Sequence, residues 1–176
     1  KDPKKRNQYL AVSLYNLSKQ NMLAVRDPHR DDDFIDHLRT QFSSLFQCCV
    51  TTNLYLSGAV KATGFIEHHD NHDVFAIQLA GRKRWHVGPP IMNHPSHRYR
   101  QVDTHSSDPA NMTVYDTVPG QILYIPAGWR HFAEPAPPEC GNSDLHGRSV
   151  HVTMGVHVPR WLDVLENVPH HCGRFI

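Results

Sequence analysis

The pattern of hydrophobic positions changes from helical to alternating near residue 47. Over residues 31–46, apolar side chains recur at helical spacing, and three aspartates at 31–33 favour the positive end of a helix dipole. After residue 47 the chain consists of short runs rich in β-branched and aromatic residues, separated by turn residues. We therefore expect a helix over 31–46 that packs on a sheet built by the residues that follow it.

Seven of these runs are predicted to be strands, and turn signals separate most of them. The predicted strands cover residues 48–57, 64–70, 73–80, 83–88, 112–118, 121–125 and 148–157. The turn signals lie at Gly81, Pro89 and Pro90, Pro119 and Gly120, and 126–128. Many short strands with only flanking helices indicate an antiparallel barrel or sandwich rather than a parallel sheet.

The two ends of the chain and two long loops complete the predicted organisation. Residues 9–12 and 22–25 are candidate N-terminal strands, and a closing helix is expected over 159–167. The polar segments 91–111 and 134–147 are predicted to be loops, and loops of this length in a compact domain are usually functional. We expect both loops to frame the mouth of a binding site.

The length of 176 residues corresponds to a single domain. We divide it into N-terminal strands and a helix over 1–47, a barrel over 48–157, and a C-terminal helix and tail over 158–176. Eighteen Lys and Arg against seventeen Asp and Glu leave a net charge of +1, which gives no support for binding to nucleic acid or to a membrane surface. These features leave the oligomeric state undetermined.

The compartment is predicted from hydropathy and cysteine usage. No stretch approaches eighteen apolar residues, and the start of the chain lacks the apolar core of a signal peptide. The four cysteines show no Cys-x-x-Cys spacing, so we expect reduced thiols rather than a zinc knuckle. These features favour a soluble, cytoplasmic protein and leave a nuclear location open.

Histidine is unusually frequent, with fifteen residues, and imidazole is the commonest metal ligand in proteins. In an extended strand, side chains two apart share a face, so His68 and Asp70 point one way and His69 points the other. An imidazole beside a carboxylate supplies two ligands of the 2-His-1-carboxylate triad that binds non-haem Fe(II). His131, which follows the predicted strand 121–125 and a turn, is the candidate third ligand.

Spacing alone leaves a second interpretation of these residues open. In a chain with this many histidines, one His-x-Asp can arise by chance, and an exposed loop of acidic residues and histidines has the same appearance. We expect the histidines in polar or terminal stretches to face solvent. These are His29, His37, His94, His97, His146, His170 and His171.

Four sequence motifs, which include the three candidate ligands, occur in the order expected for one family. They cover residues 53–56, 68–85, 119–131 and 149–156. Together they resemble the core of JmjC-type cupin oxygenases, and in particular the branch that contains the ribosomal oxygenases. The resemblance implies an all-β core with flanking helices, folded as a double-stranded β-helix, the jelly-roll or cupin barrel. It also implies that His68, Asp70 and His131 hold Fe(II).

The same resemblance implies 2-oxoglutarate and O2 as cosubstrates. Lys83 occupies the position from which a basic residue of this family binds the distal carboxylate of 2-oxoglutarate, and a carboxylate inside a barrel needs such a charge. Asn53 and Tyr55 resemble positions that contribute polar groups to the cosubstrate pocket. Ser149, which shares a strand face with His151, is a further expected contact.

The activity implied is hydroxylation of a side chain, most plausibly in a protein or peptide. A carboxylate at position 70 favours hydroxylation, because halogenases of this general type need a small residue there. Gln121 stands where the family often has an acidic residue, and we do not expect the dimerisation and winged-helix regions of ribosomal oxygenases after the barrel. Trp129 is a candidate substrate contact. A hydroxylase of a small molecule or peptide natural product, and a non-oxidative metal-binding cupin, remain alternatives.

Overall fold

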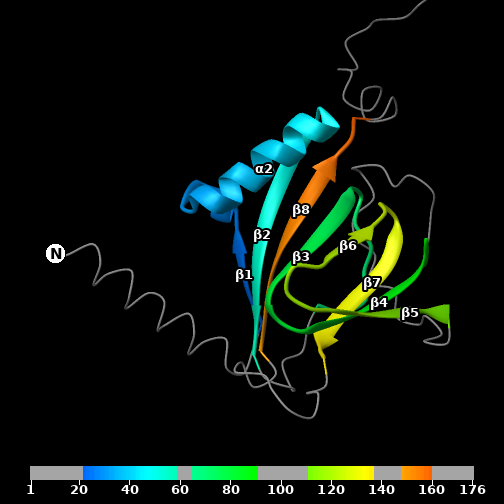
Figure 1. Ribbon diagram of the computed structural model, residues 1–176. Helices are drawn as coiled ribbons and strands as arrows, with labels where there is room; N and C mark the ends of the chain where they lie inside the picture. Colours follow the sequence, from blue (N-terminus) through cyan, green and yellow to red (C-terminus); the bar gives the residue numbers. More distant parts are fainter. Residues whose placement is uncertain (1–21, 59–64, 91–110, 137–147, 160–176) are drawn as a thin grey trace, which may run out of the picture.

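Two antiparallel sheets and one long helix make up the part of the chain that the structure, a computed structural model, describes: residues 22–58, 65–90, 111–136 and 148–159 (Figure 1). In chain order the elements are β1 (Met22–Arg26), the short 3-10 helix η1 (Pro28–Arg30), α2 (Asp33–Phe46), β2 (Cys49–Ser57), β3 (Asp73–Gly81), β4 (Lys83–Pro90), β5 (Thr113–Thr117), β6 (Ile122–Ile125), β7 (Trp129–Pro135) and β8 (Ser149–His157). The predicted all-β core with a flanking helix is confirmed.

The chain passes repeatedly from one sheet to the other. The larger sheet has the order β1-β2-β8-β3-β6, and the smaller has the order β5-β4-β7. From β3 the chain crosses to β4 and β5, returns to β6, crosses again to β7 and returns to β8. This winding produces the predicted double-stranded β-helix. It places β8, the last strand, between β2 and β3 in the larger sheet.

Helix α2 begins where the sequence predicts a favourable N-terminus. The Asp32 side chain caps it by accepting a hydrogen bond from the Ile35 amide at 3.0 Å, and Asp33 and Asp36 lie in the first turn. The helix ends at Phe46, after which Gln47 adopts the left-handed conformation. The helix therefore has a start fixed by charge and capping.

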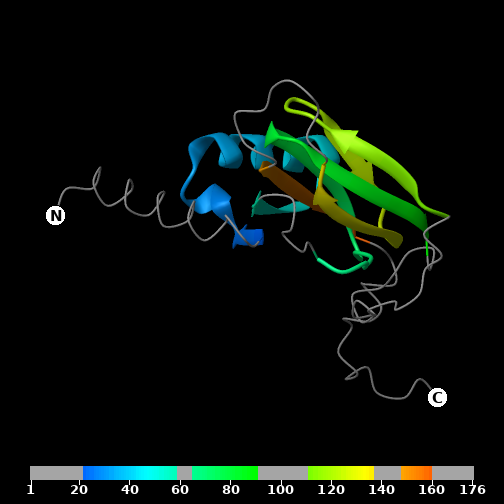
Figure 2. The same cartoon turned by 90° about the horizontal axis from the view of Figure 1, so that it is seen from below.

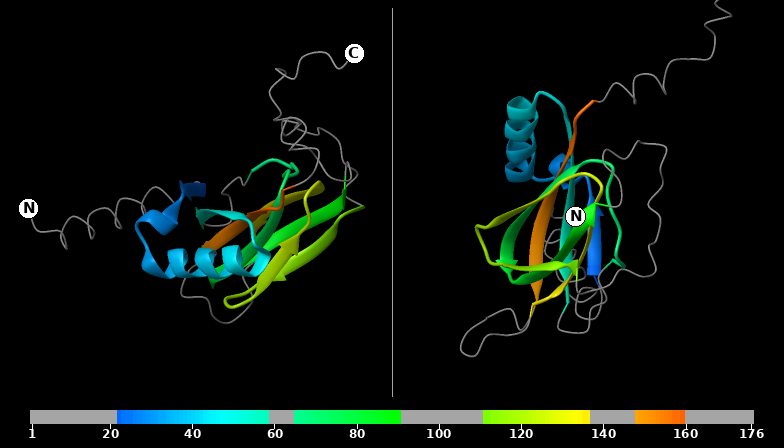
Figure 3. Two further views of the ribbon diagram at one scale, coloured as in Figure 1. Left: turned by 90° about the horizontal axis from the view of Figure 1, so that it is seen from above. Right: turned by 90° about the vertical axis from the view of Figure 1, so that its right-hand side faces the viewer.

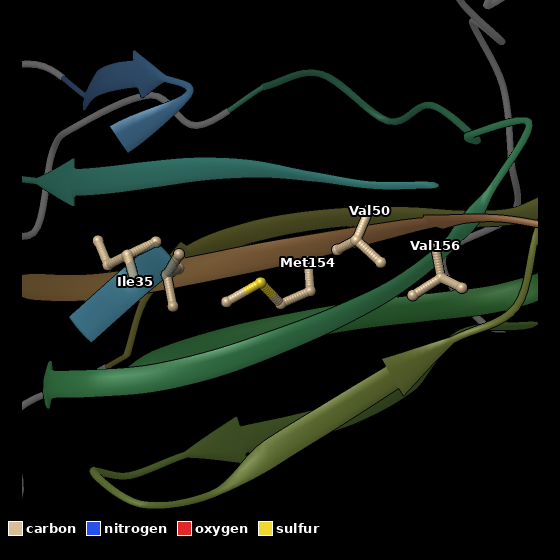
Figure 4. Packing of buried hydrophobic residues seen from close by; sticks show 5 residues of the cluster. Ile35, Val50, Met154 and Val156 are labelled. Carbon is tan, nitrogen blue, oxygen red and sulfur yellow. The ribbon is translucent and has the colours of Figure 1, made fainter. Parts of the chain in front are cut away.

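Helix α2 covers the outer face of the larger sheet, where it contacts β2 and β8 (Figures 1 and 3). Five buried side chains form the core there: Ile35, Val50, Val152, Met154 and Val156 (Figure 4). A second buried cluster contains residues from both sheets: Val74, Ala76, Trp85, Val87 and Ile125. Figure 2 shows α2 and the smaller sheet on different sides of β8. The chain thus builds one apolar layer beneath the helix and another inside the barrel.

Three local expectations are wrong. Residues 65–72 contain no strand, only an isolated bridge at His68, although 64–70 were predicted to be extended. Strand β7 was not predicted, because its alternating charged residues on one face resemble a loop, and its pairing with β4 supplies the order. Strand β4 continues to Pro90 where a turn was expected, but its pairing with β7 shifts after Val87, as befits a segment that lacks amide donors.

Several predictions fall on residues outside the described ranges. These are the strand at 9–12, nearly all of the helix over 159–167, and most of the loops 91–111 and 134–147. Among the helices of the described residues, none is long and apolar enough to cross a membrane.

Gly81 provides a test of the pairing between β3 and β8. Its φ is +66°, and a Cβ there would lie 1.8 Å from the Arg148 carbonyl oxygen. We expect Gly81→Ala to lower the free energy of unfolding by about 3 kcal/mol or more, because the backbone must move as well as adopt a strained φ. Urea denaturation followed by circular dichroism measures this change.

Gly120→Ala is the matched control. Gly120 also has a positive φ, +88°, but nothing lies within 4 Å of its Cβ position. Only the backbone strain applies, so the expected cost is about 1 kcal/mol. Equal, small effects of the two substitutions would contradict the close approach of Gly81 to β8.

Candidate active site

Two backbone hydrogen bonds bring His68 and His131 together. The His68 amide donates to the His131 carbonyl at 3.0 Å, and the His131 amide donates to the His68 carbonyl at 2.7 Å. Residues paired in this way in an antiparallel bridge project their side chains to the same face. Their ring centroids are 4.4 Å apart. A third bond, from the Gly128 amide to the Asp70 carbonyl at 2.8 Å, ties the same loop to the turn before β7.

The three predicted metal ligands form one group. A nitrogen of His68, a carboxylate oxygen of Asp70 and a nitrogen of His131 all lie within 4.8 Å of one another. His131 Nε2 is 3.6 Å from Asp70 Oδ2. Among the described residues, no other cluster of three His, Cys, Asp or Glu side chains satisfies this criterion. Two imidazoles and one carboxylate are the donor set of the facial triad, so these residues fit a divalent iron-type ion.

Hydrogen bonds select the tautomer of both histidines. His68 Nδ1 lies 2.8 Å from the Ile66 carbonyl oxygen, and His131 Nδ1 lies 3.0 Å from the Trp129 carbonyl oxygen. A carbonyl can only accept, so each Nδ1 carries the hydrogen and each Nε2 keeps a free lone pair. Burial, aided by the neighbouring His68, lowers the pKa of His131 to about 4. The His131 ring is therefore neutral near pH 7, as metal ligation requires.

The other histidines occupy varied environments. His69 is buried and does not join the triad, in keeping with the predicted alternation. His37 is exposed, as predicted. The expectation that His29 faces solvent is wrong: it is half-buried, and its Nδ1 lies 2.7 Å from Thr52 Oγ1. The remaining five histidines assigned to solvent lie outside the described residues.

Lys83 is buried at the start of β4, with 1% of its surface exposed. Its Nζ donates a hydrogen bond to Ser57 Oγ at 2.7 Å, and no carboxylate of the described residues lies within ion-pair distance of it. Burial lowers its pKa to about 8, despite the opposing effect of Glu134. A desolvated ammonium group with one neutral partner is suited to receive a carboxylate from a ligand.

Ser149 lies beside Lys83 in a buried polar group. Gln78 Nε2 donates to Ser149 Oγ at 2.9 Å, and Thr117 Oγ1 donates to Gln78 Oε1 at 3.3 Å. Ser57, the partner of Lys83, is paired with Ser149 across β2 and β8. The sequence analysis missed Ser57 and Gln78. The signal for Ser57 was its position two residues beyond Tyr55, on the same face of a strand.

Tyr55 shares the barrel face of β2 with Ser57. Its ring stacks on that of His151, with centroids 4.9 Å apart and planes at 17°. Burial, and then the charge of Asp70, raise the pKa of the Tyr55 phenol. Asn53 shares the strand face of Tyr55 and is half-buried, but no hydrogen bond to another described residue brings its side chain into the group.

Comparison with known proteins places the chain in a family. Residues 25–164 match the sequence model of the family described as JmjC domain. Human ribosomal oxygenase 1 is 32% identical over 138 residues, which cover 77% of this chain and 20% of the relative. The bifunctional lysine-specific demethylase and histidyl-hydroxylase NO66 of Drosophila pseudoobscura pseudoobscura is 31% identical over 121 residues, which cover 68% of this chain and 12% of the relative.

The solved structures agree with the fold. YcfD, a ribosomal oxygenase from Escherichia coli solved in complex with cobalt and 2-oxoglutarate, superposes with a TM-score of 0.60 at 23% identity, over 84% of this chain and 35% of that one. At this identity the likeness concerns the fold alone. The chain spans 12% to 27% of the length of the curated relatives described here and of rat ribosomal oxygenase 2.

Metal binding tests the triad directly. We expect His68→Ala and Asp70→Ala to weaken the binding of Co(II) about 100-fold or more, because each removes one of three donors. Isothermal titration of the metal-free protein measures the affinity. His37→Ala, at an exposed position of α2, and Asp36→Ala, at a half-buried position where the carboxylate pairs with Arg39, are the matched controls and should bind as the wild type does. Co(II) binding that survives both site substitutions would contradict the assignment.

Lys83 predicts an unusual dependence of stability on pH. Its pKa is about 8 in the folded protein and 10.5 in a model compound, so between these values the unfolded chain binds the proton more tightly. Stability therefore rises with pH across this window. We expect Lys83→Met to remove the rise and to stabilise the metal-free protein by about 2 kcal/mol at pH 7. Urea denaturation at pH 7 and pH 10 measures both effects, and a Lys83→Met protein less stable than wild type would contradict them.

Proposed function

This chain belongs to the JmjC-domain family, and from that premise we propose that it is an Fe(II)- and 2-oxoglutarate-dependent dioxygenase that hydroxylates a side chain of a protein or peptide. The observation that carries the proposal is the arrangement of the triad and Lys83 around one barrel interior. Three ligand side chains meet at the bridge between the segment before β3 and strand β7, and a buried ammonium group lies on the barrel face of β4. A dicarboxylate that chelates a metal through one end requires both features.

The residues of the triad would hold the iron through His68 Nε2, Asp70 and His131 Nε2. Bound iron with 2-oxoglutarate supplies oxidative decarboxylation of the keto acid to succinate and transfer of one oxygen atom of O2 to a C–H bond. Lys83 would neutralise the far carboxylate of 2-oxoglutarate, with the Ser57 hydroxyl keeping the ammonium group in place. Ser149 and Tyr55 would bound the cosubstrate on the β8 and β2 sides, and we keep Asn53 as a further candidate contact.

The protein's own task is to orient these groups and to keep them in fixed protonation states. The carbonyl groups of Ile66 and Trp129 hold both imidazoles with Nε2 free. Burial keeps His131 neutral, since its pKa of about 4 is far below physiological pH. Without these contacts each ring could rotate or take up a proton, and either change would remove a ligand.

The entrance to the site supports a polypeptide substrate. Phe65, Ile66 and Trp129 are exposed apolar side chains next to His68 and His131 in the chain or in space, and the Phe65 ring packs edge-on against His68. Apolar surface of this kind beside a catalytic centre suits contact with flanking residues of a chain. The names of the relatives, which include histidyl-hydroxylase and ribosomal oxygenase, favour a side chain of a ribosomal protein as the first class to test.

The organisation and location of the protein form part of the same proposal. We propose that residues 1–176 form one JmjC domain in which 48–157 make the barrel. Cys48 and Cys49 are free thiols, as is usual for proteins of reducing compartments, so we place the activity in the cytoplasm.

Succinate formation tests the proposed function. Purified protein with Fe(II), 2-oxoglutarate, O2 and ascorbate is expected to release succinate slowly without substrate, and faster when a ribosomal-protein digest is added. His68→Ala should abolish release in both conditions. Mass spectrometry should find a gain of one oxygen atom on a peptide of the digest.

Two variants of neighbouring basic residues sharpen the result. Lys83→Ala should raise the KM for 2-oxoglutarate about 10-fold to 100-fold, because a buried charge-assisted contact is lost. Arg84→Ala should leave it unchanged, since Arg84 faces outward and pairs with Asp116 at 2.7 Å. A protein that binds Fe(II) but neither binds nor consumes 2-oxoglutarate would be a non-oxidative cupin, and the proposal would be wrong.

A further inference from the structure

His151 is a buried imidazole with no hydrogen-bond partner among the described residues. Its side chain lies on the barrel face of β8, two residues from Ser149, and only 3% of its surface is exposed. An unpaired polar group in the interior costs free energy, and most such groups in folded proteins have a partner. A residue that avoids this cost, such as Phe, would pack equally well between aromatic neighbours. The retention of an imidazole here therefore points to a partner supplied by a ligand.

His151 lies beside residues of the candidate cosubstrate site. On one side its ring stacks on Tyr55, and the charge of Asp70 contributes to the raised pKa of the Tyr55 phenol. On the other side Trp85 packs edge-on at 5.2 Å. Burial, and then the charge of nearby Lys83, lower the pKa of His151 to about 3. The His151 ring therefore neighbours both Tyr55 and Lys83, two of the residues that we propose to bind the cosubstrate.

The two ring nitrogens of His151 differ in access. Nδ1 is buried away from solvent and has no hydrogen-bond partner. Nε2, in contrast, is not both buried and without a partner. A neutral imidazole carries one N–H donor and one acceptor, and an orphaned donor is rarer in protein interiors than an unsatisfied acceptor. The favoured tautomer thus leaves the lone pair on sealed Nδ1 and places the hydrogen on Nε2. That N–H belongs to a side chain on the barrel face of β8 and has no acceptor among the described residues.

We propose that His151 is a cosubstrate-binding residue that donates its Nε2 hydrogen to an oxygen of 2-oxoglutarate lying between the metal triad and Lys83. The inference rests on the proposed function. A neutral donor at this point complements the charge of Lys83, because a second cation beside a buried ammonium group would be repelled. The dianion would thereby meet one full positive charge and one fixed N–H along its length.

The test measures 2-oxoglutarate affinity and stability in the same variants. His151→Phe keeps a flat ring but removes the donor, so we expect 2-oxoglutarate to bind Mn(II)-loaded protein 10-fold to 100-fold more weakly in isothermal titration. The same variant should raise the Tm of the metal-free protein, since it removes an unsatisfied polar atom. His151→Gln, whose Nε2 reaches the position of the lost N–H, should recover much of the affinity. His86→Phe, in which the replaced ring stacks on Phe132 and pairs with Glu134 on the outer face, is the matched control.

The outcomes separate the two proposals. Wild-type affinity in His151→Phe, with normal binding by the wild-type protein, would overturn the role of His151 and leave the proposed function intact. Lower affinity together with a lower Tm, and no recovery in His151→Gln, would assign His151 a purely structural role and also overturn the inference. If the Mn(II)-loaded wild-type protein binds no 2-oxoglutarate, the proposed function itself is wrong.

Discussion

The reciprocal backbone hydrogen bonds between His68 and His131 are the interaction on which the candidate active site depends. His68 lies in an irregular segment before β3, whereas His131 lies in β7 of the smaller sheet. The two ring centroids are 4.4 Å apart. The bridge sets their positions through the backbone, and the bond from Gly128 to Asp70 adds the carboxylate. The backbone therefore fixes the relative positions of the three candidate ligands, which lowers the entropic cost of ordering them on binding a metal.

Polar groups in the barrel interior lower the stability of the ligand-free protein and favour the binding of a ligand. Beneath α2 the larger sheet presents a cluster of apolar side chains, such as Val152 and Met154, which contribute to folding in the usual way. Inside the barrel, Lys83 and His151 are buried with fewer partners than their chemistry requires. Such groups oppose folding in the absence of a ligand and favour the complex in its presence. The helix-covered layer offsets the destabilisation that the polar interior introduces.

The sequence was sufficient to predict the elements whose pattern is set locally. The helix α2 and the strands β2, β3 and β8 follow from periodicity and turn residues, and the triad follows from His-x-Asp together with motifs that resemble a known family. Strand β7 and the irregular segment around His68 were not predicted, because their conformation is imposed by pairing with distant residues rather than by their own composition. Ser57 and Gln78 escaped notice for a similar reason: their importance lies in which neighbours they meet across the sheet.

Strand β8 contributes to the candidate binding site with one face and to the hydrophobic core under α2 with the other. Ser149 and His151 point into the barrel, while Val152, Met154 and Val156 belong to the layer under α2. Side chains of a strand point alternately to its two faces, so every second residue lies on the same face. Inserting or deleting one residue within it would exchange the faces beyond that point, placing polar groups under the helix and apolar groups beside Lys83. A change in the length of this strand therefore disturbs both layers at once, whereas a substitution within it affects one face only.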